Sequence, residues 1–179
     1  YNLGLVFHAR NELDNAIRAY CQATSITEDR PEIWYSLAAA FHSQEHYGEA
    51  IQAYRKVTRL SPENIDAHLN LGLAYLVWGD HADAIDSFNK VIKLKPDHLQ
   101  ALENLCVSYF SAKQYDQAIS AGQKALEIDS NELWVMGYII VGCVLPGSIT
   151  KANEISDKLI AADNSKEEVN RALYFLNQQ

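Results

Sequence analysis

The sequence predicts an all-α protein, an α-solenoid in which short antiparallel helix hairpins stack along the chain. The first observation is a repeat of 34 residues, clearest in a column of alanines: Ala16, Ala50, Ala84, Ala118 and Ala152. The second is a parallel column of larger apolar residues: Leu3, Leu37, Leu71, Leu105 and Ile139. The third is the absence from the sequence of the sustained apolar–polar alternation that strands would show. Self-similarity at this period is typical of arrays of helical hairpins.

One repeat unit shows how its elements are expected to begin and end. Ser61-Pro62-Glu63 predicts a helix start, because it offers a hydroxyl cap, a proline that needs no donor and an acid near the helix N-terminus. Trp78-Gly79-Asp80 predicts the turn inside the hairpin. A second helix is expected over 82–94, and Lys95-Pro96 ends it.

The same register divides the whole chain into units. We expect one array over residues 1–178, with a partial repeat at 1–30, repeats at 31–64, 65–98 and 99–132, a degenerate repeat at 133–164 and a capping helix at 165–178. Tyr1 would then lie inside the first helix of a repeat whose beginning is missing, so the chain is expected to be a fragment of a longer protein.

The repeated columns are expected to form the core. A hairpin of two short helices cannot bury both of its faces, so stacked neighbours must complete the core. The alanine column should lie where the second helix crosses the first, because a larger side chain would hold the backbones apart. The columns that begin at Leu3 and Phe7 should fill the space between the helices.

The spacing and the residue types together resemble the tetratricopeptide repeat family. The resemblance rests on NLGLAY at residues 70–75, on ADAIDSF at 82–88 and on Pro62 and Pro96, and it covers residues 1 to about 130. It implies a right-handed superhelix in which the first helices of the hairpins line a concave groove that binds peptides. It also implies a non-catalytic scaffold for protein–protein interaction.

The resemblance implies a set of groove residues in this chain. They would be Tyr35, His42, Asp66, Leu69, Asn70, Leu73, Leu76, Glu103, Asn104 and Phe110. Asn70 and Asn104, with Ser36 one repeat earlier, are similar to the asparagine ladder in the repeat domain of O-linked N-acetylglucosamine transferase. Side-chain amides that face away from the core could hold a peptide through its backbone. The alternative is that the NLG motif is simply common in such repeats.

The charge of the groove predicts the class of ligand. The groove columns contain acidic residues and no Lys or Arg, so the partner should be a protein segment that is neutral or basic and apolar. Relatives that grip a chaperone C-terminus do so with a Lys/Arg clamp, so that ligand is disfavoured. A second reading is a substrate-recognition or regulatory repeat domain of a larger enzyme, such as a glycosyltransferase.

Motifs for catalysis are weak in this sequence. HSQEH, from His42 to His46, matches the H-x-x-E-H pattern of inverted zinc peptidases, with Glu45 as the base. The register places His42 near the end of one helix and His46 in the following turn, which argues against a zinc site on one helix. The sequence has no phosphate-binding glycine motif and no GxSxG. We therefore expect no enzyme, no cofactor and no metal.

Composition limits the remaining classes of partner. The net charge of −8 is spread along the chain and argues against nucleic acid, which selects a basic stripe. No apolar run has the length of a transmembrane helix, so membrane insertion is not expected. Three unpatterned cysteines favour reduced thiols in a cytoplasmic setting. The first hairpin should leave apolar surface open near Val6, which predicts self-association through the ends of the array.

Overall fold

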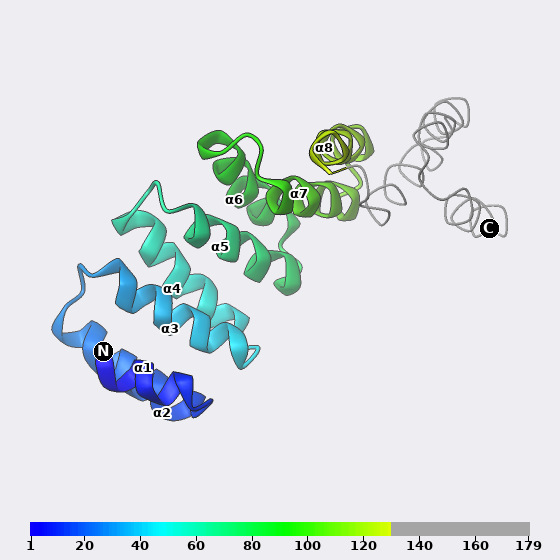
Figure 1. Ribbon diagram of the computed structural model, residues 1–179. Helices are drawn as coiled ribbons and strands as arrows, with labels where there is room; N and C mark the ends of the chain where they lie inside the picture. Colours follow the sequence, from blue (N-terminus) through cyan, green and yellow to red (C-terminus); the bar gives the residue numbers. More distant parts are fainter. Residues whose placement is uncertain (130–179) are drawn as a thin grey trace, which may run out of the picture. The chain divides into compact units, whose positions relative to one another are not determined.

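The computed structural model describes residues 1–129, which form eight α-helices and no strands in that part of the chain. The helices are α1 (Asn2–Ala9), α2 (Leu13–Ile26), α3 (Pro31–Ser43), α4 (Tyr47–Leu60), α5 (Ile65–Trp78), α6 (His81–Leu94), α7 (Leu99–Ser111) and α8 (Tyr115–Ile128). Consecutive helices pair as the predicted hairpins (Figure 1). The predicted degenerate repeat at 133–164 and the capping helix at 165–178 lie outside the described residues.

The chain divides into two compact units, Tyr1–Leu94 and Lys95–Gln179. In the first unit, hairpins α1–α2, α3–α4 and α5–α6 stack in chain order, because α2 packs on α3 and α4 packs on α5. The described part of the second unit is the hairpin α7–α8. The all-α hairpin architecture is confirmed, whereas one array over residues 1–178 stays a prediction.

The helix ends follow local signals, but one of these signals was misread. Ser61 does not start a helix: its backbone N–H donates to the Val57 carbonyl at 2.8 Å, and it ends α4. Asn64 caps α5 instead, since its side-chain oxygen accepts a hydrogen bond from the Ala67 N–H at 2.9 Å. The predicted turn is confirmed, because α5 ends at Trp78 and Gly79 has a φ of 88°. This left-handed conformation is one that glycine adopts without strain.

The four described members of the alanine column are buried as predicted, and Ala152 lies outside the described residues. Ala16, Ala50, Ala84 and Ala118 have no exposed surface. Glycines of the first helices allow a similarly close approach: a Cβ at Gly72 would lie 2.6 Å from the Phe88 ring, and one at Gly4 would lie 2.5 Å from the Tyr20 ring. Alanines on the second helices and glycines on the first helices therefore let the two helices of a hairpin pack closely, with a large aromatic ring between them.

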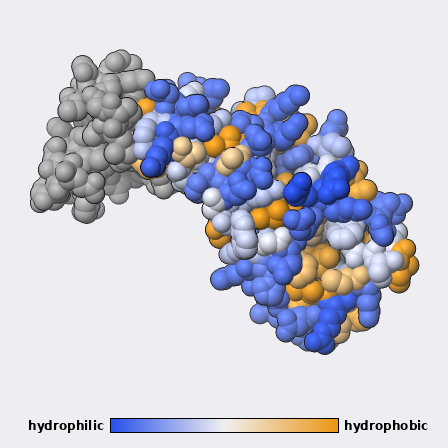
Figure 2. All heavy atoms as spheres, turned by 180° about the vertical axis from the view of Figure 1, so that it is seen from behind, coloured by the Kyte–Doolittle hydropathy of each residue, from blue (hydrophilic) through white to orange (hydrophobic). Residues whose placement is uncertain are grey.

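The prediction that the whole leucine column is buried is wrong at its first member. Leu37, Leu71 and Leu105 are buried, but Leu3 is 60% exposed. Leu37 packs with Ala16 and Tyr20 of the preceding helix α2, and no helix precedes α1 in this structure. Leu5 and Val6 of α1 are exposed as well. On one face of the described surface, Figure 2 shows hydrophobic patches in orange between hydrophilic regions in blue.

Candidate functional site

A cavity of about 350 Å³ opens on the first unit, where the first helices of its hairpins meet. Its lining residues come from the chain start, from the first two turns of α3, from the first turn of α5 and from the cap of α5: Tyr1, Pro31, Glu32, Tyr35, Ser36, Asn64 and Asp66. Pro31 is the first residue of α3, a position where the missing N–H leaves no helical bond unmade. The repeat therefore brings helix N-termini and tyrosines to one place.

Two tyrosines of this cavity each contact a polar residue of the next repeat. The Asn70 side-chain N–H donates to the Tyr35 hydroxyl at 2.7 Å, and the Tyr1 hydroxyl lies 3.5 Å from the Ser36 hydroxyl. Both pairs are 35 residues apart in sequence, so they are one contact made twice. We call this contact the Tyr–Asn/Ser rung.

The rung rests on a buried aromatic layer. The Tyr35 ring meets the Tyr54 ring edge-on at 5.7 Å between centroids, and the Tyr1 ring is tilted against Tyr20 at 6.0 Å. Tyr20 and Tyr54 are buried, so their rings fix the positions of Tyr1 and Tyr35 from the core side. The rung is therefore supported by the core of the same unit.

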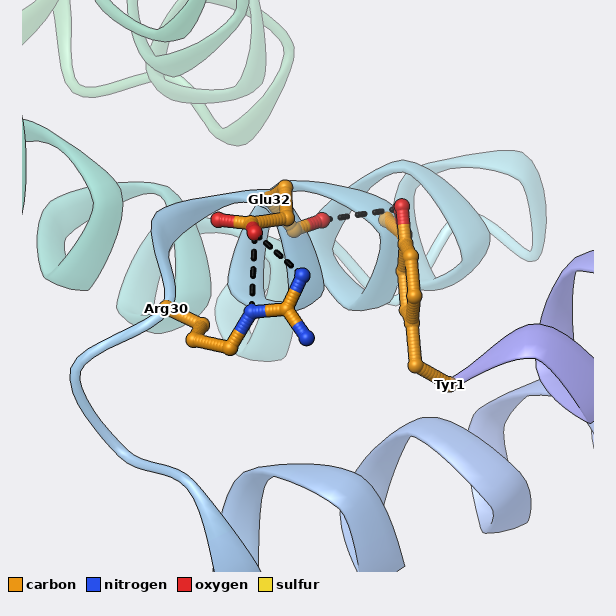
Figure 3. A network of polar contacts seen from close by, with 4 residues as sticks. Tyr1, Arg30 and Glu32 are labelled. Carbon is orange, nitrogen blue, oxygen red and sulfur yellow. Dashed lines mark hydrogen bonds and ion pairs between the residues drawn. The ribbon is translucent and has the colours of Figure 1, made fainter.

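The charges at the cavity are two carboxylates and one nearby guanidinium. Nε of Arg30 donates to the Glu32 carboxylate at 2.8 Å, and the Arg30 guanidinium carbon lies 5.7 Å from the centre of the Tyr1 ring (Figure 3). The pKa of the Glu32 carboxyl is lowered, first by its backbone hydrogen bond at the start of α3 and then by Arg30. Asp66 takes part in no ion pair among the described residues. It thus provides the more open negative charge of the cavity.

The carboxylate of Asp66 also acts on the rung. Burial raises the pKa of the Tyr35 hydroxyl, the negative charge of Asp66 raises it further, and the hydrogen bond with Asn70 lowers it in part. The hydroxyl therefore stays protonated near neutral pH, with its own O–H available as a donor while it accepts from Asn70.

The structure brings together only some of the predicted groove residues. Tyr35 and Asp66 line the cavity, and Asn70 contacts it through Tyr35. Leu73 and Leu76 of α5 are half-buried, whereas Leu69 is only 8% exposed and belongs to the core. Leu69 stands one repeat after Tyr35, and it has no hydroxyl with which to continue the rung.

The remaining predicted groove residues lie elsewhere. Glu103, Asn104 and Phe110 belong to the second unit, and the Asn104 side-chain N–H donates to the Gln100 carbonyl of its own helix at 2.7 Å. The Phe110 ring meets Tyr115 edge-on at 5.5 Å. His42 is half-buried against Tyr47 at 5.3 Å, and burial lowers its pKa. Asn70 and Asn104 thus each use one amide N–H within the protein.

Sequence reasoning missed Arg30 and Asn64 as residues of this site. They stand one period apart, with His98 one period later, and all three occupy the N-cap position of a first helix. That column would have been visible at 34-residue spacing. It was overlooked because Ser61 offered a more familiar capping signal.

The HSQEH motif does not form a single helix. His42 lies in α3 and His46 caps α4, with Glu45 between them at a φ of 60°. Their rings contact different partners, Tyr47 and Phe41. Over residues 1–129, no group of three or more His, Cys, Asp or Glu side chains is arranged to hold a metal ion.

No helix among the described residues is both long and apolar enough to cross a membrane. Sequence comparison finds family models described as TPR repeat over residues 4–45 and 40–76, and as tetratricopeptide repeat over 65–98. Together the matches run from residue 4 to residue 98, more than half of the 179 residues. No curated protein sequence matches the chain.

Several solved structures share this fold. A crystal structure of MamA has a TM-score of 0.81 and 20% identity, and the match covers 99% of this chain and 98% of that one. MamA 41-end from Desulfovibrio magneticus RS-1 has a TM-score of 0.77 and 22% identity over 90% and 92% of the two chains. YrrB, described as a TPR protein with an unusual peptide-binding site, has a TM-score of 0.82 and 20% identity over 97% and 89%.

Proposed function

The chain belongs to the tetratricopeptide repeat family, and on that premise we propose that it is a non-catalytic scaffold that binds a segment of a partner protein. The observation that carries this proposal is the cavity at Tyr35, which joins aromatic surface, hydrogen-bonding groups and two carboxylates on the first-helix side of the hairpins. Such a mixture suits an extended peptide, whose backbone needs polar partners and whose side chains need apolar ones.

The ligand we propose is neutral or basic and apolar. Asp66 and Glu32 place negative charge at the cavity, and Arg30 offsets only the charge of Glu32. A lysine or arginine of the partner would meet Asp66, while a neighbouring apolar side chain would lie on the rings of Tyr1 and Tyr35. Complementary charge of this kind raises the association rate at low salt and lowers it as salt screens the field.

The amide groups retain a role in holding the peptide backbone. A side-chain amide has two N–H donors and one carbonyl acceptor. Asn70 gives one N–H to Tyr35, and Asn104 gives one to Gln100. The second N–H and the carbonyl oxygen of each can still bind a peptide, so we propose that each amide binds peptide backbone within its own unit.

A titration with a matched pair of peptides tests the proposal. The first probe is a capped eight-residue peptide of alternating leucine and lysine, and the second has glutamate in place of lysine. We expect the lysine peptide to shift the backbone amide signals of Glu32, Tyr35 and Asp66 in a ¹⁵N spectrum. The glutamate peptide should leave them unchanged. Equal shifts with both peptides, or none with either at millimolar concentration, would refute the charge selection at this cavity.

The second reading is a recognition or regulatory domain of a larger enzyme. It shares the same peptide-binding chemistry, so the titration does not separate it from the scaffold. Sequencing of the complete natural polypeptide separates the two, since an adjoining catalytic domain would decide for the enzyme. A cytoplasmic location likewise stays a prediction, which localisation of the tagged full-length protein would test.

A further inference from the structure

A second cavity, of about 360 Å³, lies between α4 and α6 in the first unit, and it shares no residue with the cavity at Tyr35. Its floor is formed by α5, and its two walls are formed by α4 and α6. The lining residues are Arg55, Thr58, Arg59, His68, Leu71, Tyr75, Asp83, Asp86, Ser87 and Lys90. This cavity therefore lies among the second helices of the hairpins, over the buried Leu71 and Tyr75.

The repeat explains why there is space at this place. The residue one period before His68 is Trp34, and the residue one period before Lys90 is Lys56. The Trp34 indole N–H donates to the Glu28 carbonyl at 2.9 Å, and the Lys56 ammonium lies 5.6 Å from the centre of the indole ring. In the next copy a smaller ring stands in this position, and the His68 Nε2 is held by the Pro62 carbonyl at 2.9 Å. The pair Trp34 and Lys56 thus corresponds to His68 and Lys90 in the next copy, where the smaller imidazole replaces the indole.

The walls of the cavity carry charges of both signs. Arg55 and Arg59 stand one helical turn apart on α4, where the preceding copy has Cys21 and Ser25. Asp83 and Asp86 stand on α6. The ion pairs of the described residues do not include Arg55, Arg59 or Lys90. The three cations therefore face the cavity with charge that no carboxylate of residues 1–129 pairs with.

Arg55 and Asp83 both act on the hydroxyl at the floor. Burial and the charge of Asp83 raise the pKa of Tyr75, whereas Arg55 lowers it. Side chains of both walls therefore influence the same hydroxyl. A ligand that enters here would meet two arginines on α4 and, on α6, Lys90 together with two carboxylates.

We propose that this cavity is a second docking site, which takes an aromatic side chain of a partner protein flanked by acidic residues. The aromatic ring would lie over Leu71 and Tyr75 and under Lys90, as Trp34 lies under Lys56 in the preceding copy. A flanking carboxylate would pair with Arg55 and Arg59. The site differs from the one proposed above in its helices and in the charge of its ligand, so it does not rest on that proposal.

The test uses three capped tripeptides as probes in ¹⁵N titrations of the whole chain: Glu-Trp-Glu, Lys-Trp-Lys and Glu-Ala-Glu. We expect Glu-Trp-Glu to shift the amide signals of Leu71, Tyr75 and Lys90. The other two peptides should bind about tenfold more weakly or worse, since each lacks either the charge pairing or the cation–π contact. Equal binding of all three, binding of Glu-Trp-Glu at Tyr35 instead, or no shift at millimolar concentration would each overturn the proposal.

Two variants locate the binding. His68→Trp restores the residue of the preceding copy, so it should fill the cavity and abolish the shifts while the helical circular dichroism is kept. Arg55→Gln with Arg59→Gln keeps the long polar side chains and removes the charge, so binding should fall by about tenfold. Arg55 and Arg59 are exposed, so the arginine variant should fold. It therefore tests the proposal even if His68→Trp fails to fold. Wild-type binding by the arginine variant would refute the carboxylate pairing.

Discussion

The side-chain amide of Asn70 donates a 2.7 Å hydrogen bond to the hydroxyl of Tyr35, which stands 35 residues earlier in the preceding hairpin. The bond joins α3 to α5 on the side of the hairpins where the proposed peptide cavity opens. The residue proposed to hold a ligand thus also links two repeats.

The first prediction concerns this bond. Asn70→Ala should destabilise the protein by about 0.5–1.5 kcal/mol, the usual net contribution of such a hydrogen bond. Tyr35→Phe should cost a similar amount, and the double variant should cost less than the two single costs together. Urea unfolding followed by circular dichroism measures all three. Strictly additive costs would show that the bond contributes nothing to stability.

The second prediction concerns the helix crossing at Ala84. Ala84→Leu should destabilise by about 1–3 kcal/mol, because the position is fully buried and a longer side chain forces the helices apart. Ala82→Leu is the matched control on the same helix, where the position is exposed and the change should be nearly neutral. Melting temperatures of both variants decide the point, and an unchanged Ala84→Leu variant would contradict the placing of the crossing.

The third prediction concerns Gly72. An added methyl group would lie 2.6 Å from the ring of the fully buried Phe88, so Gly72→Ala should destabilise despite the better helix propensity of alanine. Gly48→Ala is the control, since its Cβ would meet only Trp78 at an ordinary 3.8 Å. We expect opposite signs for the two changes in free energy of unfolding, and the same sign for both would count against the close approach at Gly72.

The fourth prediction concerns thiol reactivity. Burial raises the pKa of Cys106 to about 12, and the side chain is inaccessible, whereas Cys21 is exposed. In a Cys143→Ser background, iodoacetamide at pH 8 should therefore alkylate Cys21 in the folded protein and spare Cys106, because only the accessible thiolate reacts. Peptide mass spectrometry measures the order. Equal labelling of both residues would show that α7 opens on the time scale of the reaction.

The fifth prediction concerns self-association through α1. Leu3 and Val6 expose apolar surface on this helix, and such a patch tends to find a partner. Sedimentation of the wild type should show a mass that rises with concentration, and Leu3→Glu with Val6→Glu should remove the rise. Ile26→Glu changes another exposed apolar residue and should have no effect. A wild type that stays monomeric at every concentration would end this proposal.

The features that repeat along the chain are the ones that could be predicted from the sequence. The alanine column, the turn at Gly79 and the helix pairs depend on periodicity and on local backbone preferences, both of which the sequence displays directly. The start of α5 was misplaced because Ser61 and Asn64 are both capable caps three residues apart. Ser61 is used to end α4, where its N–H continues the helical bonding, so Asn64 is left to begin the next helix.

The fold class, the register of the hairpins and the family follow from the amino-acid sequence, because a 34-residue period leaves few other ways to bury the apolar columns. Packing between helices sets which members of each column are covered and which polar groups meet. Leu3 is exposed while Leu37 is buried because a neighbouring helix covers only the second. Asn70 reaches Tyr35, and a cavity lies beside His68 between α4 and α6, because both depend on distances between helices that no single repeat encodes.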